Sequence, residues 1–295
     1  MITRAIILNY NTTDLTLQCV DYIIRQNDPF THIVVVDNGS ISENYEALKE
    51  RLPAASKLVR LEMNLGFSAG NNRGCGEMAG LPNADYYLFI NSDAFLTQPN
   101  SIRELRTALI KDLKAVAISP LVHTTSNEIP VRLQIQVRRV IPPGWLVVCQ
   151  SPILRRLPLI KQRYLRFIYH DLIPYQDRLY DVESINGAVF MIKSPFLHRI
   201  NLLDEGTFLY LEELILGEQI RRLNKKCLLH GGIVVPHLQG ASSIGKRGKM
   251  SFYFFTASEA HFLKKYHHFS NISLAFIKNM RHFEFAVKSV FYRFR

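Results

Sequence analysis

Short apolar runs alternate with amphipathic stretches along the first hundred residues. Four of the apolar runs have the length and the β-branched composition of buried strands: residues 5–8, 31–36, 57–61 and 86–90. Three stretches between them show the spacing of helices: residues 15–24, 43–52 and 67–78. This alternation predicts an α/β fold in which a mostly parallel sheet is flanked by helices.

The pattern changes further along the chain. A helix after Ser101 and a strand at 115–118 continue the sheet, and the periodicity then loosens from 120 to 180. Regular structure resumes at 181–193, followed by a helix at 211–223, a strand at 227–235 and helical stretches to the C-terminus. We therefore expect residues 120–180 to form a variable insertion between two more regular parts.

Composition and charge narrow the class of protein. A chain of 295 residues with 47% hydrophobic residues is long enough to bury a sizeable core. Its net charge of +11 suits an anionic partner: nucleic acid, anionic lipid or a phosphorylated substrate. The four cysteines show neither paired nor metal-ligand spacing, so we expect free thiols in a reducing compartment.

The N-terminus runs directly into a strand-like pattern, and we expect no signal peptide there. No uncharged apolar stretch reaches the roughly 18 residues of a membrane-spanning helix. Any membrane contact is therefore expected to be peripheral.

Polar residues follow each predicted strand of the first half, at Asn9, Asp37, Asn64 and Asn91-Ser92-Asp93. In open α/β sheets, ligands bind beyond the carboxyl ends of the strands, so these ends predict one shared site. Asp37 is suited to accept hydrogen bonds from a ribose, and Asp93 to hold Mg²⁺ or Mn²⁺ against a diphosphate. The alternative is that these residues only make turns after strands.

The run from Asn64 to Gly74 is more informative, because its small residues permit close backbone approach while Asn and Arg side chains remain to bind a polar ligand. Together with Val36-Asp37-Asn38-Gly39-Ser40 and Asn91-Ser92-Asp93, in this order and spacing, it resembles the family 2 glycosyltransferases, particularly the rhamnosyltransferase-like branch. The resemblance covers most of the chain, from about residue 2 to 240.

The resemblance implies a GT-A fold, an inverting single displacement and a divalent cation, Mg²⁺ or Mn²⁺. The catalytic domain would be 1–240, with a nucleotide-sugar-binding half at 1–119, the insertion at 120–180 and an acceptor half at 181–240. By the same likeness Asp93 would bind the metal. The residues implied to bind the nucleotide sugar are Asn9, Asp37, Asn38, Asn64, Gly66, Asn71, Asn72 and Ser92.

The second half extends the resemblance. Residues 186–192 resemble the acceptor-side strand, and 208–213 resemble the Glu-Asp motif that supplies the general base. Glu213 takes the place of the usual Asp and is the expected base, with Glu212 in reserve. The alternative is that both are acids favoured by a helix N-terminus. His237 lies where the family often has a His near the metal or diphosphate; the alternative is an ordinary loop residue.

Two basic segments have two interpretations each. Lys246, Arg247 and Lys249 lie in a Gly- and Ser-rich loop that would close over the diphosphate, or would simply be solvated. The basic, apolar stretch at 155–166 suits anionic lipid or a polyphosphate, or covers the core.

The C-terminal region, 241–295, combines that loop with a basic amphipathic helix. The helix would bind an anionic membrane or pack on protein. Its apolar stripe consists of Phe276, Met280, Phe283, Val287, Val290 and Phe294.

The leading hypothesis from the sequence is a cytoplasmic enzyme, peripheral at the inner face of the cell membrane, that adds one sugar to a lipid-linked oligosaccharide of a bacterial surface polysaccharide. The donor would be dTDP-rhamnose, ahead of a UDP-hexose.

Three alternatives compete with this hypothesis. A nucleotidyltransferase needs a Gly-rich basic loop after the first strand, whereas residues 9–14 contain neither Gly nor a basic residue. A nucleic-acid-binding module has the charge but no recognisable motif, so no nucleic acid is expected as partner. An inactive scaffold would not need Asp37, Asp93 and the Glu pair.

Overall fold

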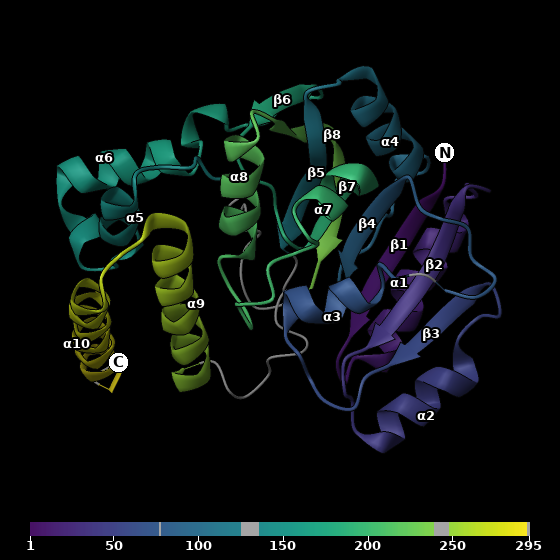
Figure 1. Ribbon diagram of the computed structural model, residues 1–295, viewed down its shortest axis with the longest axis horizontal. Coiled ribbons are helices and arrows are strands. Elements are labelled where there is room, and N and C mark those ends of the chain that lie inside the picture. The colour runs from purple at the N-terminus through teal and green to yellow at the C-terminus, as the bar shows by residue number, and fades with distance from the viewer. Residues whose placement is uncertain (77, 125–135, 239–247, 294–295) are drawn as a thin grey trace.

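The structure is a computed structural model that describes residues 1–76, 78–124, 136–238 and 248–293. The described strands form one eight-stranded sheet of order β3-β2-β1-β4-β7-β5-β8-β6 (Figure 1). The strands are β1 (Thr3–Asn9), β2 (Thr31–Asp37), β3 (Ser56–Arg60), β4 (Tyr86–Asn91), β5 (Ala115–Thr124), β6 (Leu179–Val182), β7 (Val189–Lys193) and β8 (Lys226–His237).

Strand pairing brings the polar strand ends of the first half to one edge of the sheet. β1 pairs in parallel with β2 and with β4, and Asn9 lies opposite Asp37 while Leu8 lies opposite Asn91. β7 lies between β4 and β5 and is antiparallel to both. The predicted parallel sheet is thus mixed in its second half, and the segment predicted at 181–193 contains two strands, β6 and β7, that are not neighbours.

Helices cover both faces of the sheet (Figure 1). The helices are α1 (Thr13–Arg25), α2 (Ser42–Arg51), α3 (Phe67–Arg73), α4 (Ser101–Lys111), α5 (Pro143–Gln150), α6 (Pro158–Phe167), α7 (Ser194–Arg199), α8 (Glu212–Arg222), α9 (Lys249–His267) and α10 (Asn271–Arg293), with short 3₁₀ turns at Leu154–Arg156 and His170–Leu172. The third helix is shorter than predicted, because it ends at Arg73.

The alternation of side chains along the strands divides the core into two layers. Ala5 and Ile7 of β1 face α1, α2 and α4, whereas Ile6 of the same strand faces α3, α7 and α8. Side chains of both layers are almost completely buried. Strands that are apolar on both faces therefore read as continuous hydrophobic runs, which is why the sequence pattern predicts them well.

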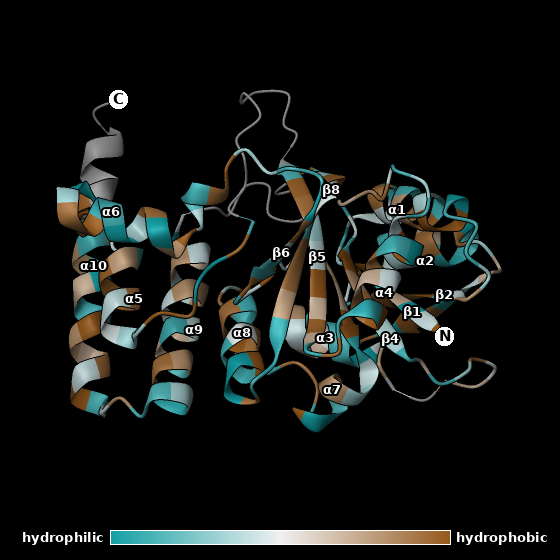
Figure 2. Ribbon diagram, turned by 90° about the horizontal axis from the view of Figure 1, so that it is seen from above, coloured by the Kyte–Doolittle hydropathy of each residue, from teal (hydrophilic) through white to brown (hydrophobic). Residues whose placement is uncertain are grey.

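A third layer of helices lies beyond α8. In Figure 2, α8, α9 and α10 follow one another away from the sheet. Leu216 and Ile220 of α8 pack on the sheet side, while Leu214 and Ile215 pack with Leu146 of α5 and with α6 and α9. Two helices, α5 and α6, thus lie within the region 120–180 that was predicted to be a variable insertion.

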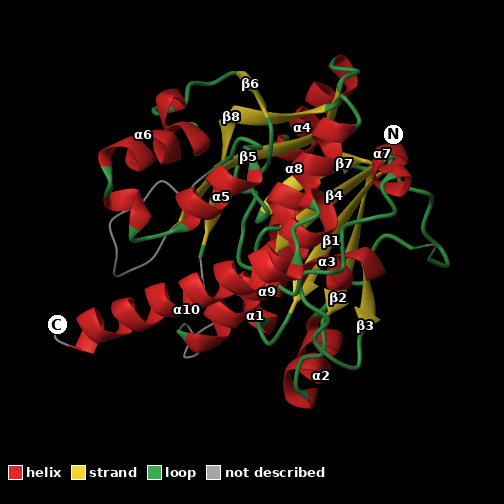
Figure 3. Ribbon diagram, turned by 60° about the vertical axis from the view of Figure 1, so that its left-hand side comes forward, coloured by secondary structure: helices red, strands yellow, loops and turns green. Residues whose placement is uncertain are grey.

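The C-terminal helix α10 lies alongside α9 and extends away from the sheet (Figure 3). Ile277 and Met280 pack with Val147 of α5, whereas Phe276 and Phe283 are 71% and 65% exposed. The predicted apolar stripe is therefore divided between a packed and an exposed side. The side chains of Val290 and Phe294 lie outside the described residues.

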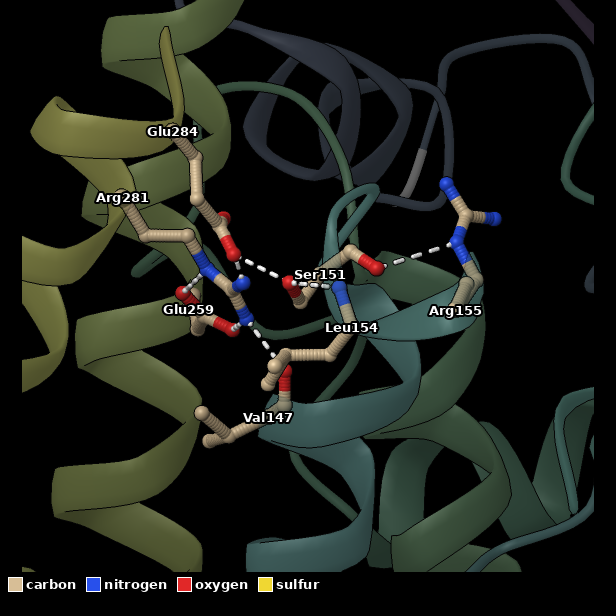
Figure 4. Close-up of polar contacts among 7 residues, drawn as sticks. All are labelled: Val147, Ser151, Leu154, Arg155, Glu259, Arg281 and Glu284. Atoms are coloured by element: carbon tan, nitrogen blue, oxygen red, sulfur yellow. Dashed lines mark hydrogen bonds and ion pairs between the residues drawn. The ribbon is translucent and has the colours of Figure 1, made fainter. Parts of the chain in front are cut away.

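A buried ion pair joins α10 to α9, and hydrogen bonds join α10 to α5 and the residue that follows it (Figure 4). The Arg281 guanidinium donates to both carboxylate oxygens of Glu259, to Glu284 Oε2 at 3.0 Å and to the Val147 carbonyl at 2.7 Å. Glu284 in turn accepts from the Ser151 hydroxyl. Because every charge in this cluster has a partner of opposite sign, α10 is held on the protein at this end.

The state of the cysteines and the hydropathy of the helices bear on two expectations from the sequence. All four cysteines are free and buried. Among the helices that the structure describes, none combines the length and hydropathy needed to cross a bilayer.

Candidate active site

A buried hydrogen-bond cluster links the ends of β1, β2 and β4. Asn9 donates to Asp37 Oδ1 at 2.7 Å and to the Ser40 hydroxyl at 3.1 Å, and its own carbonyl oxygen accepts from Thr12 and Thr16. The Thr12 and Ser92 hydroxyls are 2.9 Å apart. The strand-end polar residues do converge, as predicted. Asn9 and Asp37 are completely buried, so in this arrangement they shape the turns around the site.

The turn after β3 folds back on the turn after β2. Asn38 donates to Asn64 Oδ1 at 3.0 Å and to the Gly66 carbonyl at 3.1 Å, and its own oxygen accepts from the Leu65 amide. Gly66 has φ +85°, and a Cβ there would lie 2.4 Å from the Phe208 carbonyl oxygen. Only glycine fits both the conformation and the close approach. The Asn64–Gly74 run therefore meets the segment that leads to Glu212.

Helix α3 presents its two asparagines differently. Asn72 donates to the Leu203 carbonyl at 2.8 Å and to Glu205, and accepts from the Leu203 amide, so it attaches α3 to the segment 203–205. Asn71 donates to the Phe67 carbonyl, but its oxygen is buried with no hydrogen-bond partner among the described residues. A buried amide oxygen of this kind requires a partner, and a ligand hydroxyl would supply one.

The ends of β4 and β8 bring Asp93 and His237 together across 144 positions of the chain. His237 Nε2 lies 3.0 Å from Asp93 Oδ1, and the Leu238 amide donates to the Asp93 carbonyl at 2.9 Å. Asp93 and His237 are 7% and 5% exposed. The predicted metal residues are thus adjacent, in a largely buried position.

Oxygen and imidazole ligands suit a cation such as Mn²⁺. In the part of the chain that the structure describes, no group of three or more His, Cys, Asp or Glu side chains is arranged to hold a metal. Two protein ligands fit a cation whose other ligands are phosphate oxygens and water, as Mg²⁺ commonly has.

Glu212 and Glu213 open α8 from an unusual backbone. The two preceding residues, Tyr210 and Leu211, both have positive φ, 76° and 68°. For residues other than glycine this conformation stores about 1–3 kcal/mol each and is often found at functional sites. Helix α9 supports the segment, because the Ser258 hydroxyl donates to the Leu209 carbonyl at 2.8 Å and Phe254 stacks on Phe208.

The two carboxyl groups differ in environment. Burial, reinforced by the negative charge of Glu213, raises the pKa of Glu212 well above its usual range. Glu212 Oε2 is buried and has no hydrogen-bond partner among the described residues. A Cβ added to Gly187 would lie 3.1 Å from Glu213 Oε1, so this carboxylate rests on the turn before β7. Near neutral pH the raised pKa of Glu212 favours the protonated form of this side chain.

Glu213 and Asp93 are connected through the sheet. The Asn91 amide, two residues before Asp93, donates at 2.8 Å to the carbonyl of Ala188, the neighbour of Gly187. The sequence motifs therefore converge on one edge of the sheet from β4, β7, β8 and α8.

Some contributors were not singled out from the sequence. Gly187 is one of them: it follows Asn186 in a turn, and an Asn-Gly pair in the sequence is a signal that the backbone can approach another group closely. Nothing in the local pattern marks the left-handed Tyr210 and Leu211, or Thr12 and Thr16. The predicted closing loop with Lys246 and Arg247 lies outside the described residues.

The chain is similar to known glycosyltransferases in sequence and in structure. The sequence model described as glycosyl transferase family 2 matches residues 5–176. Over 90 residues the chain is 33% identical to glycosyltransferase GlyA of Streptococcus pneumoniae serotype 4, a match that covers 30% of this chain and 12% of GlyA. The match thus spans only a small part of that relative.

Solved structures share the fold at low sequence identity. They include GalNAc-T7 with UDP, GalNAc and Mn²⁺ (TM-score 0.56, 17% identity, 80% of this chain and 44% of that chain). Mannosyltransferase PcManGT from Pyrobaculum calidifontis, with GDP-Man and Mn²⁺, has TM-score 0.56 at 14% identity over 98% of this chain and 75% of its own. TarS residues 1–349 from S. aureus have TM-score 0.54 at 14% identity over 97% and 72%. The predicted α/β GT-A fold is confirmed by these similarities.

Proposed function

Because the chain belongs to glycosyl transferase family 2, we propose that it moves one sugar from a nucleoside-diphosphate donor to a hydroxyl of a lipid-linked glycan, with inversion at the anomeric carbon. The observation that carries this proposal is the convergence of the Asp93–His237 pair and the Glu212–Glu213 pair on one edge of the sheet. An inverting transfer requires such an arrangement, in which one group faces the leaving diphosphate and a base faces the acceptor.

Glu213 is the base in this proposal. Its carboxylate takes the proton of the acceptor hydroxyl while the hydroxyl oxygen bonds to the anomeric carbon and the bond to the diphosphate breaks. Glu212 is unsuited to the role, because its raised pKa keeps it protonated near neutrality. Its neutral form adds no second negative charge beside the base.

Asp93 and His237 would hold a divalent cation, Mg²⁺ or Mn²⁺, in contact with the diphosphate. When bound, the cation would offset the negative charge that develops on the leaving group. The solved neighbours GalNAc-T7 and PcManGT contain Mn²⁺, which supports this assignment by likeness of fold.

The nucleotide-sugar-binding residues divide into two kinds in this proposal. Asn71 contacts the donor through its buried oxygen, which has no hydrogen-bond partner among the described residues. Ser92 is assigned to the donor from the family resemblance, and its hydroxyl lies 2.9 Å from that of Thr12. Positioning falls to Gly66, whose backbone approaches Phe208 closely, and to residues whose side chains are engaged within the protein: Asn9, Asp37, Asn38, Asn64 and Asn72.

For the substrates, we keep dTDP-rhamnose ahead of a UDP-hexose, and a lipid-linked oligosaccharide of a surface polysaccharide as acceptor, from the family resemblance. A peripheral position at the inner face of the cell membrane accords with this acceptor. The exposed Ile272, Phe276 and Phe283 of α10 support it, because they lie about one and two helical turns apart on the same side.

The test is donor binding and donor hydrolysis by the full chain across a panel of nucleotide sugars, with Mn²⁺, Mg²⁺ or EDTA. The variant is Asp93→Asn, and Asp21→Asn, in an exposed ion pair with Arg25, is the matched control. We expect metal-dependent binding of one donor, lost in Asp93→Asn and retained in the control. Absence of binding to every nucleotide sugar would refute the proposal.

A further inference from the structure

A cavity of about 450 Å³ lies between α5 and α6, in the region 120–180, apart from the site described above. Its volume is within the range of small-molecule sites. The lining combines three guanidinium groups, Arg139, Arg163 and Arg166, with the apolar surfaces of Trp145, Cys149 and Phe167. The cavity is therefore suited to a ligand that is anionic at one end and apolar at the other.

The charges in the lining do not cancel. Three arginines and the single carboxylate of Asp171 leave a net charge of +2. Arg139 is held in place, because it stacks on Tyr169 at 3.9 Å and donates to the Arg166 carbonyl. Arg163 stacks on Trp145 at 4.1 Å, and neither Arg163 nor Arg166 forms an ion pair with a carboxylate among the described residues. These guanidinium groups retain donors for a phosphate, which arginine binds in a bidentate manner.

The cavity also lies directly behind the proposed catalytic segment. Cys149 and Phe167 pack in the same cluster as Leu211, Leu214 and Ile215, and Glu212 follows Leu211. The apolar wall of the cavity and the start of α8 thus belong to one hydrophobic cluster. Leu159 lies one helical turn before Arg163 on α6 and is 66% exposed, so this side of the helix also carries an apolar side chain in contact with solvent.

We propose that this cavity binds the phosphate group, and the adjoining part of the apolar chain, of a phosphate-headed amphiphile. The role as anchor for the lipid-linked acceptor rests on the proposed function; binding of the amphiphile does not. Arg163 and Arg166 bind the phosphate, and Trp145 and Phe167 contact the first carbons of the chain. The anchored acceptor then extends its sugar end toward α8.

Trp145 is the only tryptophan of the chain, so its fluorescence reports on the cavity without a label. The experiment titrates the full chain with dodecyl phosphate below its micelle concentration. Dodecanoate and dodecanol test the head group, and inorganic pyrophosphate tests the chain. We expect saturable binding of dodecyl phosphate that is at least about tenfold tighter than that of the other three, as loss of a charge-assisted bond or of the apolar contact predicts.

The variant is Arg166→Ala, and Lys161→Ala is the control, because it removes the same charge from the same helix outside the lining. Equilibrium dialysis with labelled dodecyl phosphate measures binding independently of Trp145. We expect binding about tenfold weaker or more in Arg166→Ala and within about twofold of the unmodified chain in Lys161→Ala. Retention of secondary structure by circular dichroism verifies that both variants fold.

Several results would overturn the proposal: no saturable binding of dodecyl phosphate, pyrophosphate binding of equal strength, or equal losses in the two variants. Phosphatidylcholine vesicles containing phosphatidic acid form a last arm. Binding to these vesicles alone, reduced equally in both variants, would identify surface electrostatics instead of a cavity site. A protein that binds dodecyl phosphate but no nucleotide sugar would refute the proposed function and leave the cavity assignment standing.

Discussion

Replacing Glu212 with Gln should stabilise the protein, and the gain should grow with pH. Glu212 is half-buried, and its Oε2 is shut off from solvent beside Glu213. Its folded-state pKa is therefore raised above the value in the unfolded chain. Below the ordinary pKa of a glutamate both states are protonated, and the group costs no stability. As pH rises between the two pKa values, only the unfolded chain releases the proton, so unfolding becomes more favourable.

The size of the change in stability follows from the one proton that Glu212 retains in the folded state. Each pH unit between the two pKa values lowers the free energy of unfolding by about 1.4 kcal/mol. Burial raises the pKa of Glu212 to about 8, but the side chain is only half-buried, so solvent screens part of the cost. We therefore expect a difference of about 1.4–3 kcal/mol between Glu212→Gln and the unmodified chain at pH 8. At pH 4 the difference should be close to zero, because a neutral amide replaces a neutral carboxylic acid of similar shape.

Urea unfolding at pH 4, 5, 6, 7 and 8 measures this difference directly. The matched variant is Glu213→Gln, which removes the charge that contributes to the raised pKa of Glu212. It should also gain stability at pH 8, but less, because burial of Glu212 remains. In transfer assays Glu213→Gln should lose about 10²–10⁴-fold in rate, whereas Glu212→Gln should retain most of it. A stability difference that does not change with pH would refute the assignment of the proton to Glu212, and loss of transfer only in Glu212→Gln would reverse the two roles.

Four further changes test other parts of the structure. His237→Gln removes the imidazole next to Asp93 and should weaken metal-dependent donor binding by about tenfold, measured by calorimetry with and without EDTA. Gly66→Ala should lower the free energy of unfolding by about 1–3 kcal/mol or more in urea, because its Cβ would overlap the Phe208 carbonyl; an unchanged midpoint would contradict the close approach. Gly187→Ala should lower the transfer rate more than stability, because its Cβ presses on Glu213; equal donor binding is the internal control. Arg281→Met leaves Glu259 and Glu284 buried and unpaired, and should destabilise by about 3–5 kcal/mol in thermal unfolding, more at pH 8 than at pH 4.

The sequence was a good guide where local pattern determines structure. Residues 31–36 are apolar on both faces, and they form a buried strand whose polar continuation, Asp37, meets Asn9 at the predicted edge. The prediction was weaker where a partner is distant. Nothing near Val189–Lys193 indicates that it inserts antiparallel between β4 and β5. The position of this strand depends on its pairing with strands that are far away in the sequence, and local hydrophobic periodicity does not report on such pairing.

The site shows the same division. Asp93 is marked by its place after a strand, but its neighbour His237 came only from the family resemblance, since 144 positions separate them. The sequence does not distinguish the roles of Asn71 and Asn72, because both are asparagines in the same short helix. They differ because one amide is engaged with Leu203 and Glu205, and the other keeps a buried oxygen without a partner. Side-chain environments of this kind depend on packing between elements far apart in the chain.

The position of β7 also limits how the protein can move. Because β7 is hydrogen-bonded to β4 on one side and β5 on the other, the two halves that are predicted to bind donor and acceptor share one uninterrupted sheet. Rotating the halves apart would break these ladders, so the described part of the sheet opposes the hinge motion that opens a two-lobed enzyme. In the proposed function, substrates and products would then exchange through local movements around a rigid frame. A covalent crosslink between β4 and β7 should consequently leave turnover unaffected, because these two strands do not separate during the reaction cycle.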